Sequence, residues 1–280
     1  MTPAAAAGRY ALVTGASSGI GRATSVALAR AGAHVLMACR DPRRGEAARC
    51  EVVERSGNTA VELLLADLSV QAQVRGLAGG LARRRQALHV LVNNAGIIEP
   101  RRRLSADGIE LTWATNVLAY FLLTELLLDR LREGAPARIV NVASELAGDL
   151  DLGDVQFERR PYRGNTAYAQ SKQANRMLTW AASRRLEGSG VTANAMHPGG
   201  VNTPLLARAS GLEGPAADAW ARSIGRTPEE GADTVVWLAS SPEASGLSGR
   251  FWIDRREVPC RFRDPAQEEL LRTLCESMTA

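Results

Sequence analysis

Short apolar segments rich in aliphatic residues alternate with helical patterns along nearly the whole chain. Near-continuous apolar strands that alternate with helices are typical of a parallel sheet covered by helices on both faces. The sequence therefore predicts an α/β fold with about seven parallel strands. The expected strands are 10–14, 34–39, 60–66, 88–94, 137–144, 191–197 and 249–254, and the expected helices include 19–31, 43–56, 70–85, 106–132, 166–187 and 228–240.

The length of 280 residues fits one large α/β domain better than two ordinary domains. Hydrophobic residues make up 45% of the chain and charged residues 23%, which indicates a globular rather than a disordered protein. We find no internal repeat, linker or second domain, so residues 1–280 are expected to form a single domain with its core at 8–254. The tail, 255–280, is expected to leave a strand and to form an amphipathic helix from about residue 265.

The formal net charge of +4 and the pI of about 9.2 come from scattered arginines. The arginine runs at 83–85 and 101–103 could be read as nucleic-acid patches. A solvated helix end and a loop explain them better in a chain that uses arginine throughout. We therefore expect no nucleic-acid partner.

The four cysteines, at 39, 50, 260 and 275, show no CxxC or metal-ligand spacing. We expect free thiols in a reducing compartment and no metal site. The stretch "MTPAAAAGRY" lacks the basic region of a signal peptide, and no uninterrupted apolar run reaches about 18 residues. These features predict a cytoplasmic protein that does not enter a membrane.

A glycine-rich turn, "VTGASSGIG", follows the first expected strand and opens a helix, with Gly15, Gly19 and Gly21. Glycines in this position permit a tight turn and close backbone approach, and the helix N-terminus offers N–H groups to a pyrophosphate. A glycine-rich connection that binds nothing is the alternative. The strand-turn-helix context favours a dinucleotide site.

The end of the second strand indicates which dinucleotide binds. A carboxylate for the adenosine ribose is usual there in NAD sites, but this chain has Cys39 followed by Arg40, with Arg43 and Arg44 in the next turn. Guanidinium groups can pair with a 2′-phosphate. Asp41 lies close by but is expected to cap the next helix. We therefore expect NADP(H), with NAD(H) as the weaker alternative.

Lys172 is the only lysine among the 34 basic residues, and it follows Tyr168 by four positions in a helical stretch. Residues four apart share a helix face. A phenol has a pKa near 10, and a cation beside it favours the phenolate. An ordinary exposed lysine is the alternative. Because the chain uses arginine at every other basic position, the retention of lysine at 172 predicts that Lys172 and Tyr168 act together in proton transfer.

The motifs together resemble the short-chain dehydrogenases/reductases, in their short form, over nearly the whole chain. Within that family, "ACRDPRRGEAA", "RGNTAYAQSK" and the tail resemble the retinol-dehydrogenase-like, NADP-preferring branch. The resemblance implies one Rossmann-type doubly wound domain. The motifs, in the family's order, are "TGASSGIG" at 14–21, "ADL" at 66–68, "NNAG" at 93–96, "TN" at 115–116, Ser144 after "NVA", "YAQSK" at 168–172 and "HPGGVNT" at 197–203.

The resemblance implies catalytic roles for four residues. Tyr168 would be the general acid toward a ketone or aldehyde, or the base toward an alcohol. Lys172 would lower the Tyr168 pKa and hold the nicotinamide ribose. Ser144 would hydrogen-bond the substrate oxygen, and Asn116 would fix a water that links Lys172 to solvent.

The resemblance also implies a path for the cofactor. Asp67 would meet the adenine, Asn93 the adenosine side, and Pro198 and Thr203 the nicotinamide end. The full set of expected cofactor residues is Gly15, Ser17, Ser18, Gly19, Ile20, Gly21, Arg40, Asp67, Leu68, Asn93, Ala95, Gly96, Tyr168, Lys172, Pro198, Gly199, Val201 and Thr203.

The chain departs from the retinol-dehydrogenase-like pattern near the substrate. It has "NVLAYF", with Ala119 and Tyr120, where related members often read "NxLGHF", and "SKQAN", with Gln173, where they read "SKLAN". Segments 145–167 and 203–227 are expected to form the substrate rim, the second as a mobile lid or as a surface helix. We expect a medium or large, partly apolar carbonyl compound or alcohol, and not a retinol enzyme.

The sequence thus predicts an NADP(H)-dependent carbonyl reductase or alcohol dehydrogenase. A cyclase or dehydratase on the same scaffold, or a dinucleotide-binding regulator, is the alternative; the intact Asn116, Ser144, Tyr168 and Lys172 favour the reductase. The helices 106–132 and 166–187 match those that pair subunits in many family members, so we expect a homodimer. The tail could instead cap these helices.

Overall fold

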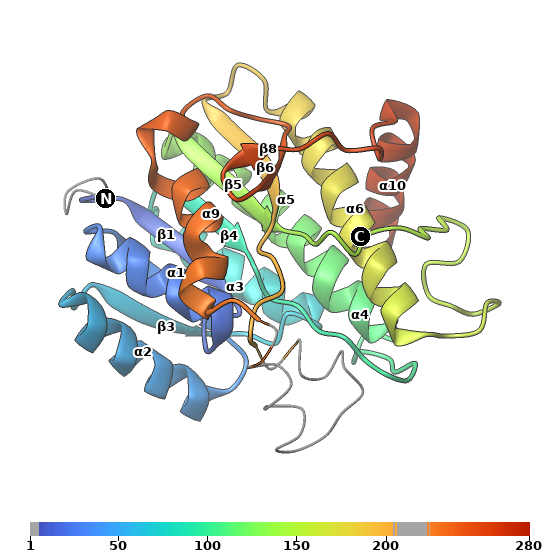
Figure 1. Cartoon of the computed structure of the whole chain (residues 1–280), viewed down its shortest axis with the longest axis horizontal. Helices are drawn as coiled ribbons and strands as arrows, with labels where there is room; N and C mark the ends of the chain where they lie inside the picture. Colours follow the sequence, from blue (N-terminus) through green and yellow to red (C-terminus); the bar gives the residue numbers. More distant parts are fainter. Residues whose placement is uncertain (1–5, 204, 206–222, 224) are drawn as a thin grey trace.

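The computed structural model of the chain, which describes residues 6–203, 205, 223 and 225–280, contains an eight-stranded sheet in the order β3-β2-β1-β4-β5-β6-β7-β8 (Figure 1). Seven strands run parallel, as the sequence predicts, and β8 pairs with β7 in the antiparallel direction. The strands are β1 (Tyr10–Thr14), β2 (His34–Cys39), β3 (Val61–Leu65), β4 (Val90–Asn93), β5 (Ala137–Val142), β6 (Val191–His197), β7 (Phe251–Ile253) and β8 (Arg256–Glu257).

Helices cover both faces of this sheet, which explains why its strands are apolar throughout. Successive strand residues alternate between the two faces: Val13 packs in the cluster of α1, α2 and α9, whereas Leu12 packs in the cluster of α3 and α5. The helices are α1 (Gly19–Arg30), α2 (Pro42–Ser56), α3 (Gln71–Arg83), α4 (Leu111–Trp113), α5 (Ala119–Glu133), α6 (Gly164–Arg185), α9 (Pro228–Ser240) and α10 (Pro265–Met278).

The expected helix 106–132 differs most from the structure. It begins at Leu111 and contains a π-helical segment, η1 (Ala114–Leu118), before α5. By length and hydropathy the continuous stretch Leu111–Glu133 could cross a membrane, but 78% of its most apolar window is buried inside the protein. Such burial is typical of a core helix.

The tail forms α10, which lies beside α6 (Figure 1). Leu271 and Cys275 of α10 are fully buried in a cluster with Trp113, Phe121 and Leu178. This helix therefore covers part of the surface that α5 and α6 would otherwise present to a second subunit. The homodimer stays a prediction.

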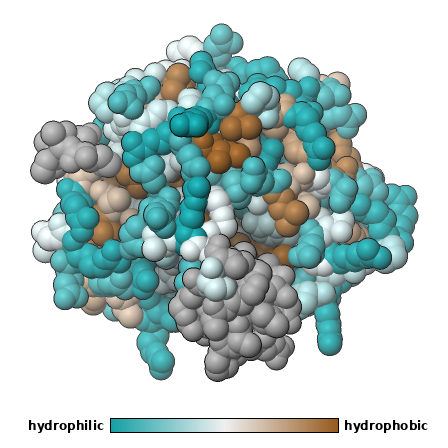
Figure 2. All heavy atoms as spheres, in the orientation of Figure 1, coloured by the Kyte–Doolittle hydropathy of each residue, from teal (hydrophilic) through white to brown (hydrophobic). Residues whose placement is uncertain are grey.

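The surface in Figure 2 is mostly hydrophilic, with hydrophobic side chains gathered in smaller areas. The two arginine runs are exposed, and members of both form ion pairs: Arg84 with Glu62, at 2.6 Å, and Arg103 with Glu99, at 3.4 Å. These contacts agree with solvated surface charge.

Candidate active site

A long groove runs along the carboxyl ends of the parallel strands. β1 lies between β2 and β4, so the chain direction across the sheet reverses beside it, and such a point is where open α/β sheets bind ligands. No group of three or more His, Cys, Asp or Glu in the described ranges could hold a metal ion. The predicted residues that line the groove are Gly15, Ser17, Ser18, Gly19, Ile20, Arg40, Asp67, Leu68, Ala95, Gly96, Tyr168, Lys172, Pro198 and Thr203.

The glycine turn has the geometry of a cradle. Gly15 has φ +65°, and a Cβ there would lie 2.8 Å from the Ala95 Cα. A Cβ on Gly19 would lie 2.8 Å from the Thr203 Cγ2. Only glycine fits these positions without displacing a neighbour, so the turn closes tightly beneath the groove.

The first turn of α1 faces the groove with free donors. Ser18 is the N-cap and, within the described chain, makes no side-chain hydrogen bond to the helix. The orphan N–H groups of a helix N-terminus favour an anion. A dinucleotide pyrophosphate fits this chemistry.

The end of β2 forms the basic part of the groove. Cys39 is buried, and burial raises the pKa of its thiol to about 11, so it carries no charge at neutral pH. Arg40 and Arg44 are exposed and line the groove. Asp41 is the N-cap of α2, and its Oδ1 accepts a hydrogen bond from Arg44 N at 2.8 Å. The capping role predicted for Asp41 is confirmed, and the local charge is positive.

Tyr168 and Lys172 lie on one face of α6 at the opposite end of the groove. Lys172 is only 2% exposed, and its Nζ donates a hydrogen bond to Val142 O at 2.8 Å. The same Nζ lies 5.5 Å from the centre of the Tyr168 ring. The lone lysine is therefore not an exposed helical residue, because it is buried at the site.

Burial shifts both titrating groups away from charge. It raises the pKa of Tyr168 to about 12, an effect that the Ser144 hydroxyl opposes by hydrogen bonding. It lowers the pKa of Lys172 to about 7. The sequence suggested that Lys172 depresses the Tyr168 pKa, but burial of the phenol dominates in the chain itself. Tyr168 therefore holds its proton at neutral pH, as a general acid must.

Ser144 follows β5, and its hydroxyl lies near enough to the Tyr168 phenol to lower the pKa of that phenol. Its Oγ also accepts a hydrogen bond from Leu146 N at 3.1 Å. The carbonyl of Ser144 accepts a hydrogen bond from Arg176, whose guanidinium stacks 3.7 Å from the centre of the Phe251 ring. Arg176, one turn beyond Lys172 on α6, thus holds the backbone of Ser144 in place.

Asn116 lies in the π-helical segment η1 and is fully buried. Its Oδ1 accepts from Ile97 N and its Nδ2 donates to Ile97 O, both at 2.9 Å, and Nδ2 also donates to Ser171 Oγ at 3.1 Å. A Cβ on Gly96 would lie 3.6 Å from the Asn116 Oδ1 and 3.7 Å from the Lys172 Nζ. Asn116 therefore fixes the loop after β4 beside Lys172.

Four predicted cofactor residues lie off the groove wall. Asn93 is fully buried, and its Nδ2 donates to Thr124 Oγ1 and to Asn141 Oδ1. The neighbouring Asn94 lines the groove and donates to Thr14 O at 2.8 Å. Asn93 therefore points away from the groove and the next residue points into it, because side chains alternate across a strand. The contact of Asn93 with the adenosine stays a prediction. The other three are Gly21, Gly199 and Val201.

These three support the wall from behind. A Cβ on Gly21 would lie 2.5 Å from Gly15 O, so Gly21 lets α1 approach the turn closely. Val201 is buried, and a Cβ on Gly231 would lie 2.5 Å from its Cγ2. Gly199 has φ +82°, which turns the chain after Pro198 back toward the groove.

Sequence reasoning missed other lining residues. Residue type gives little signal for them, since most are small or aliphatic. Position directly after a strand could have indicated three of them, Ala66, Asn94 and Ala143. They are Ala38, Ala66, Asn94, Ile97, Thr115, Val142, Ala143 and Leu205, together with Cys39, Asp41 and Arg44, which were noted only as neighbours of Arg40.

Polar residues of α6 hold the rim segment 145–167. Gln170 Nε2 donates to Val155 O at 2.8 Å, and Gln173 Oε1 accepts from Leu150 N at 3.3 Å. Gln173, a departure from the expected "SKLAN", therefore fastens this chain's own rim. The second expected rim segment, 203–227, lies mostly outside the described residues.

Comparisons with known proteins show what this chain is similar to. A family model described as short chain dehydrogenase matches residues 9–211. Retinol dehydrogenase 13 of Homo sapiens is 36% identical, over 95% of this chain and 82% of that protein. A solved structure of an uncharacterized protein from Mycobacterium Paratuberculosis has a TM-score of 0.77 at 33% identity, covering 98% of this chain and 94% of that one.

A short chain dehydrogenase from Burkholderia cenocepacia, solved in complex with NADP, has a TM-score of 0.69 at 31% identity, covering 89% of this chain and 97% of that one. The family resemblance predicted from the motifs is confirmed by these matches. The chain belongs to the short chain dehydrogenase family of oxidoreductases.

Proposed function

We propose that the protein is an NADP(H)-dependent oxidoreductase that reduces a ketone or aldehyde to an alcohol, or catalyses the reverse reaction. One observation carries the proposal: Tyr168 and the buried Lys172, one turn apart on α6, lie on the same groove as the glycine turn of α1. A proton donor and a dinucleotide cradle on one groove are the two parts that carbonyl reduction needs.

When bound, NADPH supplies the hydride. Tyr168 holds a proton at neutral pH and would deliver it to the oxygen of the substrate. Ser144 would donate a hydrogen bond to that oxygen as negative charge develops there. Lys172 would orient the ribose through the donors that Val142 O does not use.

The preference for NADPH rests on charge at the end of β2. Arg40 and Arg44 line the groove there, and the residue at the strand end is an uncharged thiol. Guanidinium groups match a 2′-phosphate. Asp41 also lines the groove here, but its carboxylate caps α2. The bound NADP of the Burkholderia cenocepacia relative supports the same choice.

The substrate is proposed to be a medium or large, partly apolar carbonyl compound or alcohol. Leu146, two residues after Ser144, is 54% exposed and offers an apolar contact near the site. Retinal is a second candidate, because retinol dehydrogenase 13 is 36% identical to this chain.

The cytoplasm is the proposed location of the protein. The described cysteines are all unpaired, which fits that compartment.

A panel of ketones and aldehydes, including retinal, tests the proposal through NADPH consumption measured at 340 nm, beside titrations of NADPH and NADH by fluorescence. We expect NADPH to bind more tightly and at least one carbonyl to be reduced. NADPH binding without turnover across the panel would favour a dinucleotide-binding regulator. Conversion of a substrate without net NADPH consumption would favour a cyclase or dehydratase.

A further inference from the structure

Lys172 is held in a setting that disfavours its charge. An ammonium group has three N–H donors, but in the described chain only the bond to Val142 O is formed with protein. The side chain is 2% exposed, and burial is the cause that lowers its pKa. In the described ranges no carboxylate acts on that pKa. A charged Lys172 therefore needs another source of stabilisation.

Two aromatic rings lie close to the Lys172 Nζ. The Tyr168 ring on α6 has its centre at 5.5 Å, and the Tyr120 ring on α5 has its centre at 5.6 Å. Both distances are within the range in which a ring face attracts a cation. Tyr168 is the proposed proton donor, whereas Tyr120 has no role in the proposed reaction. This residue stands where the "NxLGHF" pattern has His.

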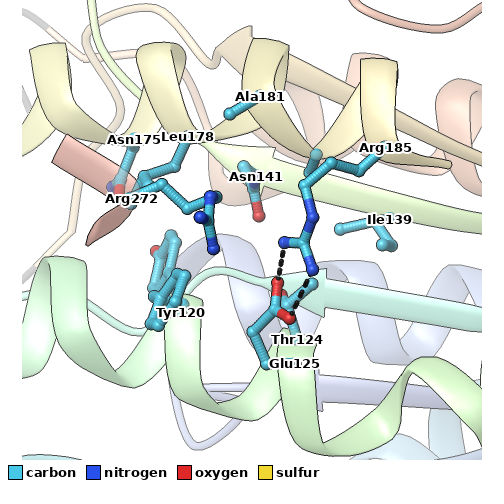
Figure 3. A pocket seen from close by; sticks show the side chains of 12 residues that line it. Tyr120, Thr124, Glu125, Ile139, Asn141, Asn175, Leu178, Ala181, Arg185 and Arg272 are labelled. Atoms are coloured by element: carbon cyan, nitrogen blue, oxygen red, sulfur yellow. Dashed lines mark hydrogen bonds and ion pairs between the residues drawn. The ribbon is translucent and has the colours of Figure 1, made fainter. Parts of the chain in front are cut away.

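Tyr120 is 3% exposed, and its hydroxyl has no hydrogen-bond partner within the described chain. It lines a small cavity between α5 and α6 together with Asn141 and Asn175 (Figure 3). Burial raises the pKa of Tyr120 well above 10, so it stays neutral and does not compete for the proton of Lys172. A neutral ring in contact with a buried cation stabilises the charged form.

We propose that Tyr120 is a positioning residue that favours the charged form of Lys172 by presenting its ring to the ammonium group. The inference rests on the proposed function, because a charged Lys172 matters there for holding the ribose. The titratable groups that face Lys172 are Tyr168 from α6 and Tyr120 from α5, and the neutral Asn116 lies beside it from η1. If Tyr120 only fills space, an aliphatic side chain would leave the Lys172 charge unchanged.

The single lysine makes a direct test possible. Protein labelled with [¹³Cε]lysine, made without a lysine-containing tag, gives one lysine side-chain NMR signal, whose titration reports the Lys172 pKa without assignment. We expect Tyr120→Leu to lower the midpoint by about one pH unit. Tyr120→Phe keeps the ring and should lower it by less than about a third of a unit. Tyr120→Met, which fills irregular space, replaces the Leu variant if that protein melts early.

Phe121→Leu is the matched control. Phe121 is buried on the same helix and lines the same cavity, but among the described residues only Tyr120 and Tyr168 place a ring beside the Lys172 Nζ. It should leave the Lys172 midpoint in place. Equal midpoints in the parent, Tyr120→Leu and Tyr120→Met would overturn the inference, as would an equal fall in Phe121→Leu. A fall in Tyr120→Phe as large as in Tyr120→Leu would also overturn it, because the hydroxyl and not the ring would then be responsible.

The pH dependence of NADPH binding tests whether the charge on Lys172 holds the nicotinamide ribose. NADPH affinity is expected to fall as the pH rises through the Lys172 pKa, and in Tyr120→Leu this fall should begin about one pH unit lower. An unchanged profile would contradict the link to the ribose. Failure of the parent to bind NADPH would reject the proposed function instead, while the NMR titration would still decide the role of Tyr120.

Discussion

Around the end of β2 the groove is lined by exposed arginines, whereas around α6 it is lined by the half-buried Tyr168 and the buried Lys172. Arg40 and Arg44 are exposed guanidinium groups, and they recognise an anion through their positive charge. At the other end, burial raises the pKa of Tyr168 to about 12 and lowers that of Lys172 to about 7. Solvent-exposed residues can thus recognise the cofactor, but proton transfer requires groups whose pKa is shifted by the surrounding protein.

The largest effect is expected at the buried end. Tyr168→Phe removes the proton donor and keeps the ring, so carbonyl reduction should fall by about 10²–10⁴. NADPH affinity should stay close to that of the parent, because the phenol is not among the anion-binding groups. Steady-state rates and fluorescence titration measure the two quantities separately. Retention of more than about a tenth of the parent rate would exclude Tyr168 as the general acid.

Lys172→Arg is the next largest change. The guanidinium keeps a positive charge, but its planar shape does not fit the space beside Val142 O and Gly96, where the ammonium lies. We expect weaker NADPH binding and loss of most turnover. Arg185→Lys, the reverse change at the exposed end of the same helix, should act like the parent. A fully active Lys172→Arg would show that the lone lysine is an accident of composition.

At the exposed end a smaller effect is expected. The parent should bind NADPH at least about tenfold more tightly than NADH, which corresponds to about 1.4 kcal/mol. Arg40→Asp should erase or reverse that ratio, as measured by titration with both cofactors. Arg43→Asp is a matched control, since Arg43 is exposed in the same turn but does not line the groove. Equal affinities for the two cofactors in the parent would contradict the assignment.

The smallest effect concerns stability. Burial lowers the Lys172 pKa from 10.5 to about 7, so between these values the unfolded chain binds a proton that the native protein does not. Native stability therefore rises with pH across this interval. Lys172→Met should melt several degrees higher than the parent below pH 7, with the difference shrinking toward pH 10. Thermal melts across this pH range would contradict the account if the difference were constant.

The sequence predicted the fold well because strand and helix periods are local patterns. All seven parallel strands lie where apolar runs indicated them, and Asp41 caps α2. β8 was not predicted, since a two-residue strand carries no alternation. The π-helical turn at Ala114–Leu118 was not predicted either, because an inserted residue leaves the apolar pattern almost unchanged.

For the site, the spacing of Tyr168 and Lys172 was enough to place them together, and the glycine turn located the cradle. The choice between Asn93 and Asn94 could not be made, because it depends on where β4 ends. The direction of the Tyr168 pKa shift was also hidden, since burial depends on packing from several helices. Tyr120 entered the sequence comparison only as a departure, and its contact with Lys172 is visible only when α5 and α6 are placed together.

The central claim is that Tyr168 delivers a proton to a carbonyl that receives hydride from NADPH. Isotope transfer tests it most directly: a carbonyl from the panel is incubated with NADPH carrying deuterium at C4, using each of the two stereospecifically labelled forms. The account predicts that one form transfers deuterium to the former carbonyl carbon, as mass spectrometry of the alcohol would show, and that Tyr168→Phe binds the same NADPH but transfers almost none. Product without deuterium from either form, or undiminished transfer by Tyr168→Phe, would contradict it.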